Sequence, residues 1–301
     1  MAARPTLYVL FTMNIEPPGG RNVQDGPPSW SVSAQAIDGF ATRLLRAGFP
    51  PTMFIAPICA TEHDPLLEEV GRRGAELALF LHPPHLGDGR FNKTLGQYRA
   101  ADQRDLIDYA AERFADVFGH RPRSFRSGMF SASDETFQIL YDLGFRQSSI
   151  SEPGRALTNR AAEWTDTLLD PHYVNANQRK QAGDLGLLEI PVTSEPEREL
   201  IRGIPPALQI ESGTFSDMLQ PLLRGRIERF EREQVGLPTL CFYTSNRFDY
   251  YTASEKQTQS LEAIIDMLLD ELAEHYTIAP VTAAGLHEAY RQHTRLATEL
   301  R

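Results

Sequence analysis

Short apolar runs with strand character alternate with amphipathic helical patterns along nearly the whole chain of 301 residues. The predicted strands cover residues 7–15, 52–56, 75–81, 124–126, 146–151, 187–192, 239–243 and 276–278. The predicted helices cover residues 33–47, 65–73, 97–118, 214–234 and 254–274, with two more that begin near residues 131–133 and at residue 282. Such alternation is typical of parallel strands joined by helices, as an open sheet or a barrel. The sequence therefore predicts an α/β protein.

No change of composition marks a domain boundary, and the sequence contains no internal repeat. Residues 152–186 are the least regular stretch and are rich in Pro, Gly, Asn and Asp. A loop of this length in a compact protein carries functional or packing side chains. We therefore expect one domain over residues 1–301 with an irregular insertion at about 152–186.

The charge balance restricts the partners of the chain. A formal net charge of -10 argues against nucleic acid, because binding to a phosphate backbone depends on a basic surface. The apolar run at residues 7–11 is too short for the core of a signal peptide or for a membrane span. We expect a cytoplasmic protein that binds neither nucleic acid nor membrane, and homo-oligomerisation stays open.

The apolar run at residues 76–81 ends in His82-Pro83-Pro84-His85. Proline cannot continue a strand ladder, so both imidazoles are predicted where a buried strand passes into a loop. In α/β enzymes this end of the strands carries the chemistry, and imidazole is a common metal ligand. The alternative is that two histidines in a proline-rich loop are exposed residues of no function.

Six segments carry a family resemblance: Phe-Thr-Met-Asn-Ile-Glu at 11–16, Pro-Thr-Met-Phe-Ile-Ala-Pro at 51–57, Gly-Ala-Glu-Leu-Ala-Leu-Phe-Leu-His at 74–82, Pro-Arg-Ser-Phe-Arg-Ser-Gly-Met-Phe at 122–130, Tyr-Asp-Leu-Gly-Phe-Arg at 141–146 and Val-Thr-Ala-Ala-Gly-Leu at 281–286. In this order they resemble motifs of the NodB-homology domain of the polysaccharide deacetylases, which are metal-dependent carbohydrate esterases. The resemblance covers nearly the whole chain. It implies the distorted, incomplete (β/α) barrel of the NodB type.

The resemblance also implies a metal site, although several of its residues differ here. The family has an aspartate base where this chain has Asn14, and a metal histidine where it has Phe80. Glu16, His82 and His85 remain as predicted ligands, because Glu16 shares a strand face with Asn14 and His82 shares one with Phe80. Two imidazoles and one carboxylate suit a divalent metal, and zinc is the predicted ion.

The remaining predicted site residues follow from the same comparison. Arg126 matches the arginine that orients the family's aspartate, and Asp249 is the nearest titratable residue where the family has an acid histidine. The predicted catalytic residues are Asn14, Glu16, Arg126 and Asp249. The predicted substrate-binding residues are Trp30, Phe80, Phe130 and Ser245, near strand ends where aromatic rings stack on sugars; for the aromatic residues, packing in the core is the alternative.

Two functions remain open from the sequence. The first is a metal-dependent hydrolase that removes an acyl group from an amino sugar or a related small amide. The second is a catalytically degenerate relative that binds a saccharide or another small ligand without hydrolysis. A nucleophilic esterase is disfavoured because the sequence has no Gly-x-Ser-x-Gly motif.

Overall fold

The structure is a computed structural model that describes residues 4–19, 26–86, 89–198 and 201–299. In this part of the chain a nine-stranded sheet has the order β10-β1-β2-β3-β4-β5-β9-β8, and β11 pairs with the first half of β1. Its strands are β1 (Thr6–Ile15), β2 (Thr52–Ile55), β3 (Glu76–Leu81), β4 (Ser124–Ser127), β5 (Gln147–Ser148), β8 (His172–Tyr173), β9 (Leu188–Glu189), β10 (Thr239–Ser245) and β11 (Thr277–Pro280). Every pair is parallel except β8 with β9.

The long strand β1 is paired with three other strands of this sheet. It pairs with β10 along residues 8–14 on one side, and on the other side with β11 along residues 6–9 and with β2 along residues 12–15. Such a strand is buried on both faces, which explains its nearly continuous apolar sequence. Its last residues therefore reach the same edge of the sheet as the ends of β2 and β10.

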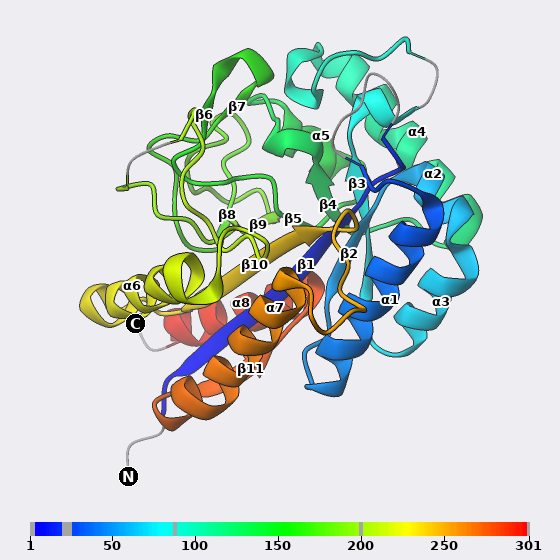
Figure 1. Cartoon of the computed structure of the whole chain (residues 1–301). Coiled ribbons are helices and arrows are strands. Elements are labelled where there is room, and N and C mark those ends of the chain that lie inside the picture. The colour runs from blue at the N-terminus through cyan, green and yellow to red at the C-terminus, as the bar shows by residue number, and fades with distance from the viewer. Residues whose placement is uncertain (1–3, 20–25, 87–88, 199–200, 300–301) are drawn as a thin grey trace.

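Helices cover the outside of the sheet (Figure 1). They are α1 (Trp30–Arg46), α2 (Pro57–Glu62), α3 (Asp64–Arg72), α4 (Ala100–Phe118), α5 (Thr136–Asp142), α6 (Gln220–Glu233), α7 (Lys256–Asp266) and α8 (Ala283–Glu299). A π-helical turn, η5 (Phe215–Leu219), precedes α6, and the turns η6 (Met267–Glu271) and η7 (Leu272–Glu274) follow α7. The predicted helices at 214–234 and 254–274 are therefore divided into shorter pieces.

Helix α1 illustrates how sequence pattern becomes packing. The Ser29 hydroxyl accepts a hydrogen bond from the Val32 amide at 3.3 Å and caps the first turn. One face of the helix, which includes Phe40, is buried against the sheet. Gly39 allows the chain after β10 to pass close by, because a Cβ there would lie 2.5 Å from the backbone of Tyr250. This contact fixes α1 beside the C-terminal end of β10.

The sheet curls into an incomplete barrel, and a loop bridges its opening. After β9, the amide of Val192 donates to the carbonyl of Ser151 at 3.0 Å and the amide of Thr193 donates to that of Cys241 at 3.1 Å. Strand β10 donates in turn from the amide of Tyr243 to the carbonyl of Leu208 at 3.0 Å. The chain between β9 and α6 thus links β5 with β10 where no further strand closes the barrel.

The insertion at 152–186 is packed into the molecule. It contains β6 (Ala156–Leu157), the 3₁₀ turn η4 (Thr158–Arg160), β7 (Ala162–Glu163) and β8. Trp164 is fully buried, and its indole Nε1 donates to the carbonyl oxygen of Phe130 at 2.7 Å. The insertion therefore fixes the chain that follows β4.

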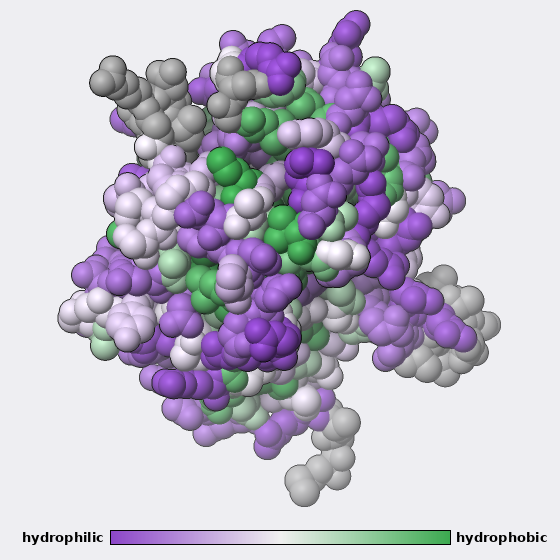
Figure 2. Space-filling model, turned by 90° about the vertical axis from the view of Figure 1, so that its right-hand side faces the viewer, coloured by the Kyte–Doolittle hydropathy of each residue, from purple (hydrophilic) through white to green (hydrophobic). Residues whose placement is uncertain are grey.

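The face over α1 to α4 is mostly hydrophilic. Figure 2 shows its apolar residues as small separate patches among polar side chains. Within the described residues, no helix combines the length and the apolar character needed to cross a bilayer.

Candidate functional site

The C-terminal ends of β1, β3, β4 and β10 bring the predicted site residues to one edge of the barrel. Asn14 is the register partner of Ser245, and Phe80 is the partner of Arg126. Partners in a parallel sheet point to the same face. Arg126 contacts Asn14 across the barrel, so these four side chains share its interior face.

Arg126 is fully buried, and its hydrogen bonds organise the barrel mouth. The guanidinium donates from Nη1 to Asn14 Oδ1 at 3.1 Å and to Thr12 Oγ1 at 2.8 Å. On its other side it donates from Nη2 to Ser149 Oγ at 2.7 Å and from Nε to the Ser149 carbonyl at 3.0 Å. Its carbon Cζ also lies 4.2 Å from the ring centroid of Phe54. Burial lowers the pKa of Arg126, and in the described part of the chain no carboxylate forms an ion pair with it.

These bonds fix the orientation of the Asn14 amide. A guanidinium can only donate, so the amide oxygen faces Arg126 and the Nδ2 group occupies the other end of the side chain. Asn14 is half-buried at the barrel mouth. An amide takes no proton from water, so the residue in the position of the family's base presents a hydrogen-bond donor.

Glu16 is held at the rim by Asn246. The Asn246 side chain accepts from the Glu16 amide at 3.0 Å and donates to the Glu16 carbonyl at 2.8 Å. Asn246 also donates to the hydroxyl of Ser33 on α1 at 2.7 Å. The Glu16 side chain is 11% exposed, and its Oε2 lies 3.8 Å from His85 Nε2.

The two histidines lie at the end of β3 and in the following 3₁₀ turn, η1 (Pro83–Leu86). Their ring centroids are 4.7 Å apart and the rings are nearly perpendicular. Burial, and secondly the charge of His82, lower the pKa of His85 to about 3, so His85 is neutral at neutral pH. Neither of its ring nitrogens has a hydrogen-bond partner among the described residues. The His82 ring packs so closely on Gly128 that a Cβ at Gly128 would overlap it.

The predicted metal ligands do not form a complete metal site. Among the residues that the structure describes, no group of three or more His, Cys, Asp or Glu side chains is arranged to hold a metal ion. Glu16 and His85 approach each other, whereas the His82 ring lies against Gly128. A catalytic zinc site needs three protein ligands, and the three predicted donors are not arranged as such a site among the described residues.

The predicted aromatic residues are largely enclosed. Phe80 is 2% exposed and its ring centroid lies 6.3 Å from that of His85. Phe130 is 5% exposed and packs edge-on against Tyr243 at 5.4 Å. Trp30 is half-buried and packs edge-on against the ring of His63, with 5.5 Å between the ring centroids. Of the three rings, only that of Trp30 retains substantial exposure.

Asp249 is engaged in a local turn. Its Oδ1 accepts from the amides of Tyr251 and Thr252, at 2.7 and 3.2 Å, and its Oδ2 accepts from the Thr252 hydroxyl at 2.6 Å. Burial raises the pKa of Asp249, but these hydrogen bonds outweigh it and the pKa is lowered. The carboxyl is therefore ionised at neutral pH and poorly suited to donate a proton.

Two buried carboxylates at the mouth were not predicted. Glu152 pairs with Arg155 and accepts from the Tyr243 hydroxyl at 2.9 Å. Glu189 accepts from the amides of Ile150 and Ser151, at 2.8 and 2.7 Å. Glu152 comes from the irregular segment and Glu189 from a two-residue strand. No sequence pattern marked either residue, because Tyr243 and the amides that contact Glu189 are brought near only by the tertiary fold.

No protein-family model and no curated protein matches this sequence. Solved structures do resemble it. A protein described as a polysaccharide deacetylase from Mycobacterium smegmatis aligns over 97% of this chain and 95% of its own, with a TM-score of 0.65 and 15% identity. A protein described as a polysaccharide deacetylase from Pseudomonas aeruginosa PAO1 aligns over 95% of this chain and 91% of its own, with a TM-score of 0.61 and 14% identity. The PuuE allantoinase aligns over 95% of this chain and 90% of its own, with a TM-score of 0.59 and 14% identity.

These likenesses extend over nearly the full length of each protein. They agree with the curled, incomplete barrel described above. The chain therefore has the fold of the polysaccharide deacetylases, which confirms the fold predicted from the sequence.

Proposed function

We propose that this chain is a catalytically degenerate protein of the polysaccharide deacetylase fold, whose barrel mouth binds a saccharide or a similar small polar ligand without hydrolysing it. The observation that carries the proposal is the hydrogen bond from the buried Arg126 to Asn14 Oδ1. This bond leaves the Nδ2 group of Asn14, a hydrogen-bond donor, where the family has the base that takes a proton from water.

The loss of hydrolysis follows from the groups that remain. A general base or acid contributes about 10²- to 10⁴-fold to a rate. Asn14 supplies no base, and Asp249 is held in a turn with a lowered pKa. The predicted metal ligands do not form a three-donor set. Together these changes remove the groups that would activate water and protonate a leaving group.

The same residues suit reversible binding. The Nδ2 group of Asn14 donates to a carbonyl or hydroxyl oxygen of the ligand, and the half-buried Ser245 next to it offers a hydroxyl. Arg126 holds the Asn14 amide in one orientation, which reduces the entropy lost on binding. Trp30 is the predicted aromatic residue that retains exposure for stacking on a sugar ring.

The test compares three proteins in the presence of zinc, with N,N′-diacetylchitobiose as the probe. We expect calorimetry to detect binding to the unmodified chain, and an acetate assay to detect no turnover. Asn14→Asp keeps the shape of the side chain but replaces the donor by an acceptor, so it should weaken binding at least about threefold. The exposed Asn92→Asp is the matched control and should bind unchanged. Acetate release by the unmodified chain, or equal binding by Asn14→Asp, would refute the proposal.

A metal-dependent amide hydrolase is the second candidate, with Glu16, His82 and His85 as ligands. The observation that favours it is His85, whose buried ring nitrogens lack hydrogen-bond partners among the described residues and whose Nε2 lies 3.8 Å from Glu16 Oε2. Stoichiometric zinc in the purified protein, lost in His82→Ala, would favour this candidate. Asn14→Asp with Phe80→His restores two of the family's residues and should create acetate release. A folded, zinc-loaded double variant without activity would reject the correspondence with the family's catalytic positions.

A further inference from the structure

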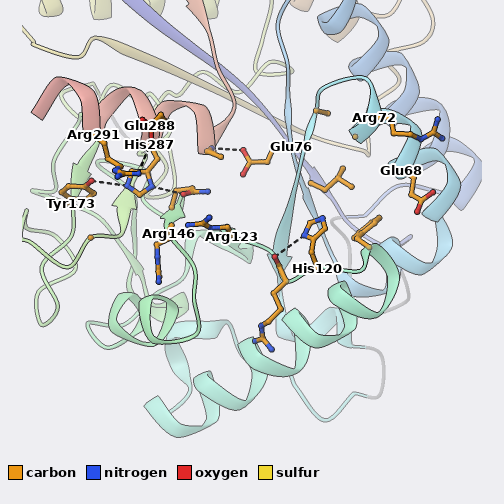
Figure 3. Close-up of a pocket in the computed structure, with 18 residues that line it drawn as sticks. Glu68, Arg72, Glu76, His120, Arg123, Arg146, Tyr173, His287, Glu288 and Arg291 are labelled. Carbon is orange, nitrogen blue, oxygen red and sulfur yellow. Dashed lines mark hydrogen bonds and ion pairs between the residues drawn. The ribbon is translucent and has the colours of Figure 1, made fainter. Parts of the chain in front are cut away.

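A cavity of about 1180 Å³ lies at the opposite end of the barrel from the candidate site. It is lined by residues at the N-terminal ends of β3, β4 and β5 and by side chains from α3, α4 and α8. In Figure 3, His287, Glu288 and Arg291 reach it from α8 on one side, and Glu68 and Arg72 from α3 on the other. None of the residues assigned to the barrel mouth lines this cavity.

The carboxylate of Glu76 accepts hydrogen bonds from the floor of the barrel. Its Oε2 accepts from the Ala284 amide at the start of α8, at 2.9 Å, and from the Thr52 hydroxyl at 3.2 Å. Its Oε1 accepts from the Ser124 hydroxyl. Glu76 therefore joins α8 to the sheet, and both of its carboxylate oxygens face donors of the barrel floor.

His287 is held neutral in the wall. Gln147 Oε1 can only accept, so His287 donates to it from Nδ1 at 3.0 Å. Nε2 accepts from the Tyr173 hydroxyl at 3.3 Å. Burial, followed by the positive charges of Arg291 and Arg123, lowers the pKa of His287 to about 4. The positive charge of this wall therefore comes from arginines.

Five arginines line the cavity, and two of them have no acidic partner. The three that form ion pairs are Arg72 with Glu69, Arg121 with Asp108 and Arg291 with Glu288. Arg123 and Arg146 form no ion pair within the described part of the chain. Arg146 donates from Nη1 to the carbonyls of Phe145 at 2.6 Å and Tyr141 at 3.2 Å, and its Cζ lies 4.7 Å from the ring centroid of Tyr141. Two guanidiniums without counter-ions share one cavity although the chain carries a net charge of -10. Glu68, which forms no ion pair with any residue that the structure describes, lies on the α3 side of the cavity, whereas Arg123 and Arg146 lie on the opposite side (Figure 3). The positive charge on this second side favours an anionic group there.

Apolar side chains form another part of the lining. Leu77, Phe118 and Ala75 are each partly buried and border the same space. A free inorganic ion would leave this surface in contact with water. A ligand with an anionic group and an apolar body satisfies both parts of the cavity.

We propose that this cavity binds a small organic phosphate, with its phosphate group on Arg123 and Arg146 and its body against Leu77 and Phe118. The planar fork of a guanidinium matches the oxygens of a phosphate group, and such charge-assisted bonds are among the strongest in proteins. The proposal does not depend on the function of the barrel mouth.

The test uses phenyl phosphate as the probe, with inorganic phosphate and phenol as comparisons, in calorimetry at low ionic strength. We expect phenyl phosphate to bind more tightly than inorganic phosphate, and phenol not to bind. Arg123→Gln removes one guanidinium and should weaken phenyl phosphate binding about tenfold or more. The matched control is Arg232→Gln, an exposed arginine outside the cavity, and its affinity should be unchanged.

Equal affinity of Arg123→Gln and the unmodified chain would overturn the proposal, as would tight binding of phenol or no binding of phenyl phosphate at millimolar concentration. Asn14→Asp should bind phenyl phosphate as tightly as the unmodified chain does. A failure of the cavity proposal is thereby distinguished from a failure of the barrel-mouth proposal. If Arg123→Gln does not fold, modification of arginines by phenylglyoxal in the unmodified chain provides the readout. Phenyl phosphate should then protect Arg123 and Arg146, and an absence of protection would refute the site.

Discussion

Asn14→Asp places a carboxylate against a buried cation, and its effect on stability can be worked out from the structure. At the 3.1 Å between Arg126 Nη1 and Asn14 Oδ1, opposite charges attract by about 5 kcal/mol at an effective dielectric constant of about 20. Removing a half-buried carboxylate from water opposes several kcal/mol of this attraction. A carboxyl beside an arginine typically has its pKa lowered by about 1 to 3 units, which corresponds to about 1.4 to 4 kcal/mol.

The sign of the pH dependence follows from this lowered pKa. The added stability is complete above the carboxyl pKa of the unfolded chain, about 3.9, and is lost as the pH falls through the lower folded pKa. Urea unfolding at several pH values between about 3 and 7 measures it. The free energy of unfolding of Asn14→Asp, relative to the unmodified chain, should rise by about 1 to 1.3 kcal/mol between pH 3 and pH 7, because the rest of the change lies below pH 3. Asn92→Asp is the exposed control and should show little change. Equal pH dependence of Asn14→Asp and the control would show that Arg126 does not act as an uncompensated buried charge.

Three further substitutions test the packing around the site. Burial lowers the pKa of His85 to about 3, so its contribution to stability is complete above about pH 6.5 and is lost towards pH 3. His85→Leu should therefore flatten the fall in unfolding free energy between about pH 6 and pH 4 by about 1 kcal/mol per pH unit, and unchanged slopes in urea titrations would contradict this. Gly128→Ala forces a methyl group against the His82 ring and should cost about 1 to 3 kcal/mol in urea unfolding; a loss near zero would show that the ring moves freely. Trp164→Phe removes the 2.7 Å hydrogen bond to the Phe130 carbonyl and should lower stability by about 1 to 3 kcal/mol, whereas an unchanged melting temperature would mean that the insertion does not support the mouth.

Local chemistry made several elements predictable. The prolines after the run at 76–81 end β3 at Leu81 and place His82 and His85 beyond the strand, as expected from proline's missing amide. The predicted strand at 239–243 corresponds to β10. The predicted helix at 254–274 is divided into α7 and two irregular turns, because its apolar pattern does not specify the hydrogen-bond spacing of the last turns.

The site was less predictable than the scaffold. The pairing of Arg126 with Asn14 was expected from the motifs, and the structure contains this hydrogen bond at 3.1 Å. The enclosure of Phe80 and Phe130 and the contact of the His82 ring with Gly128 depend on strands far apart in the sequence. The burial of Glu152 was not predicted, because its distant partner Tyr243 meets it only through the fold, whereas Arg155 lies three residues away in an irregular segment.

The sequence by itself determined the order of strands and helices, the segments at the barrel mouth and the replacement of a base by Asn14, since each depends on residue type and local spacing. Only the tertiary structure decided which of the predicted ligand side chains lie close together. The angle between two ligating side chains depends on register, curl and packing across the sheet. For the same reason the arginine-lined cavity at the far end of the barrel appeared only in three dimensions, because its walls come from separate helices and strands.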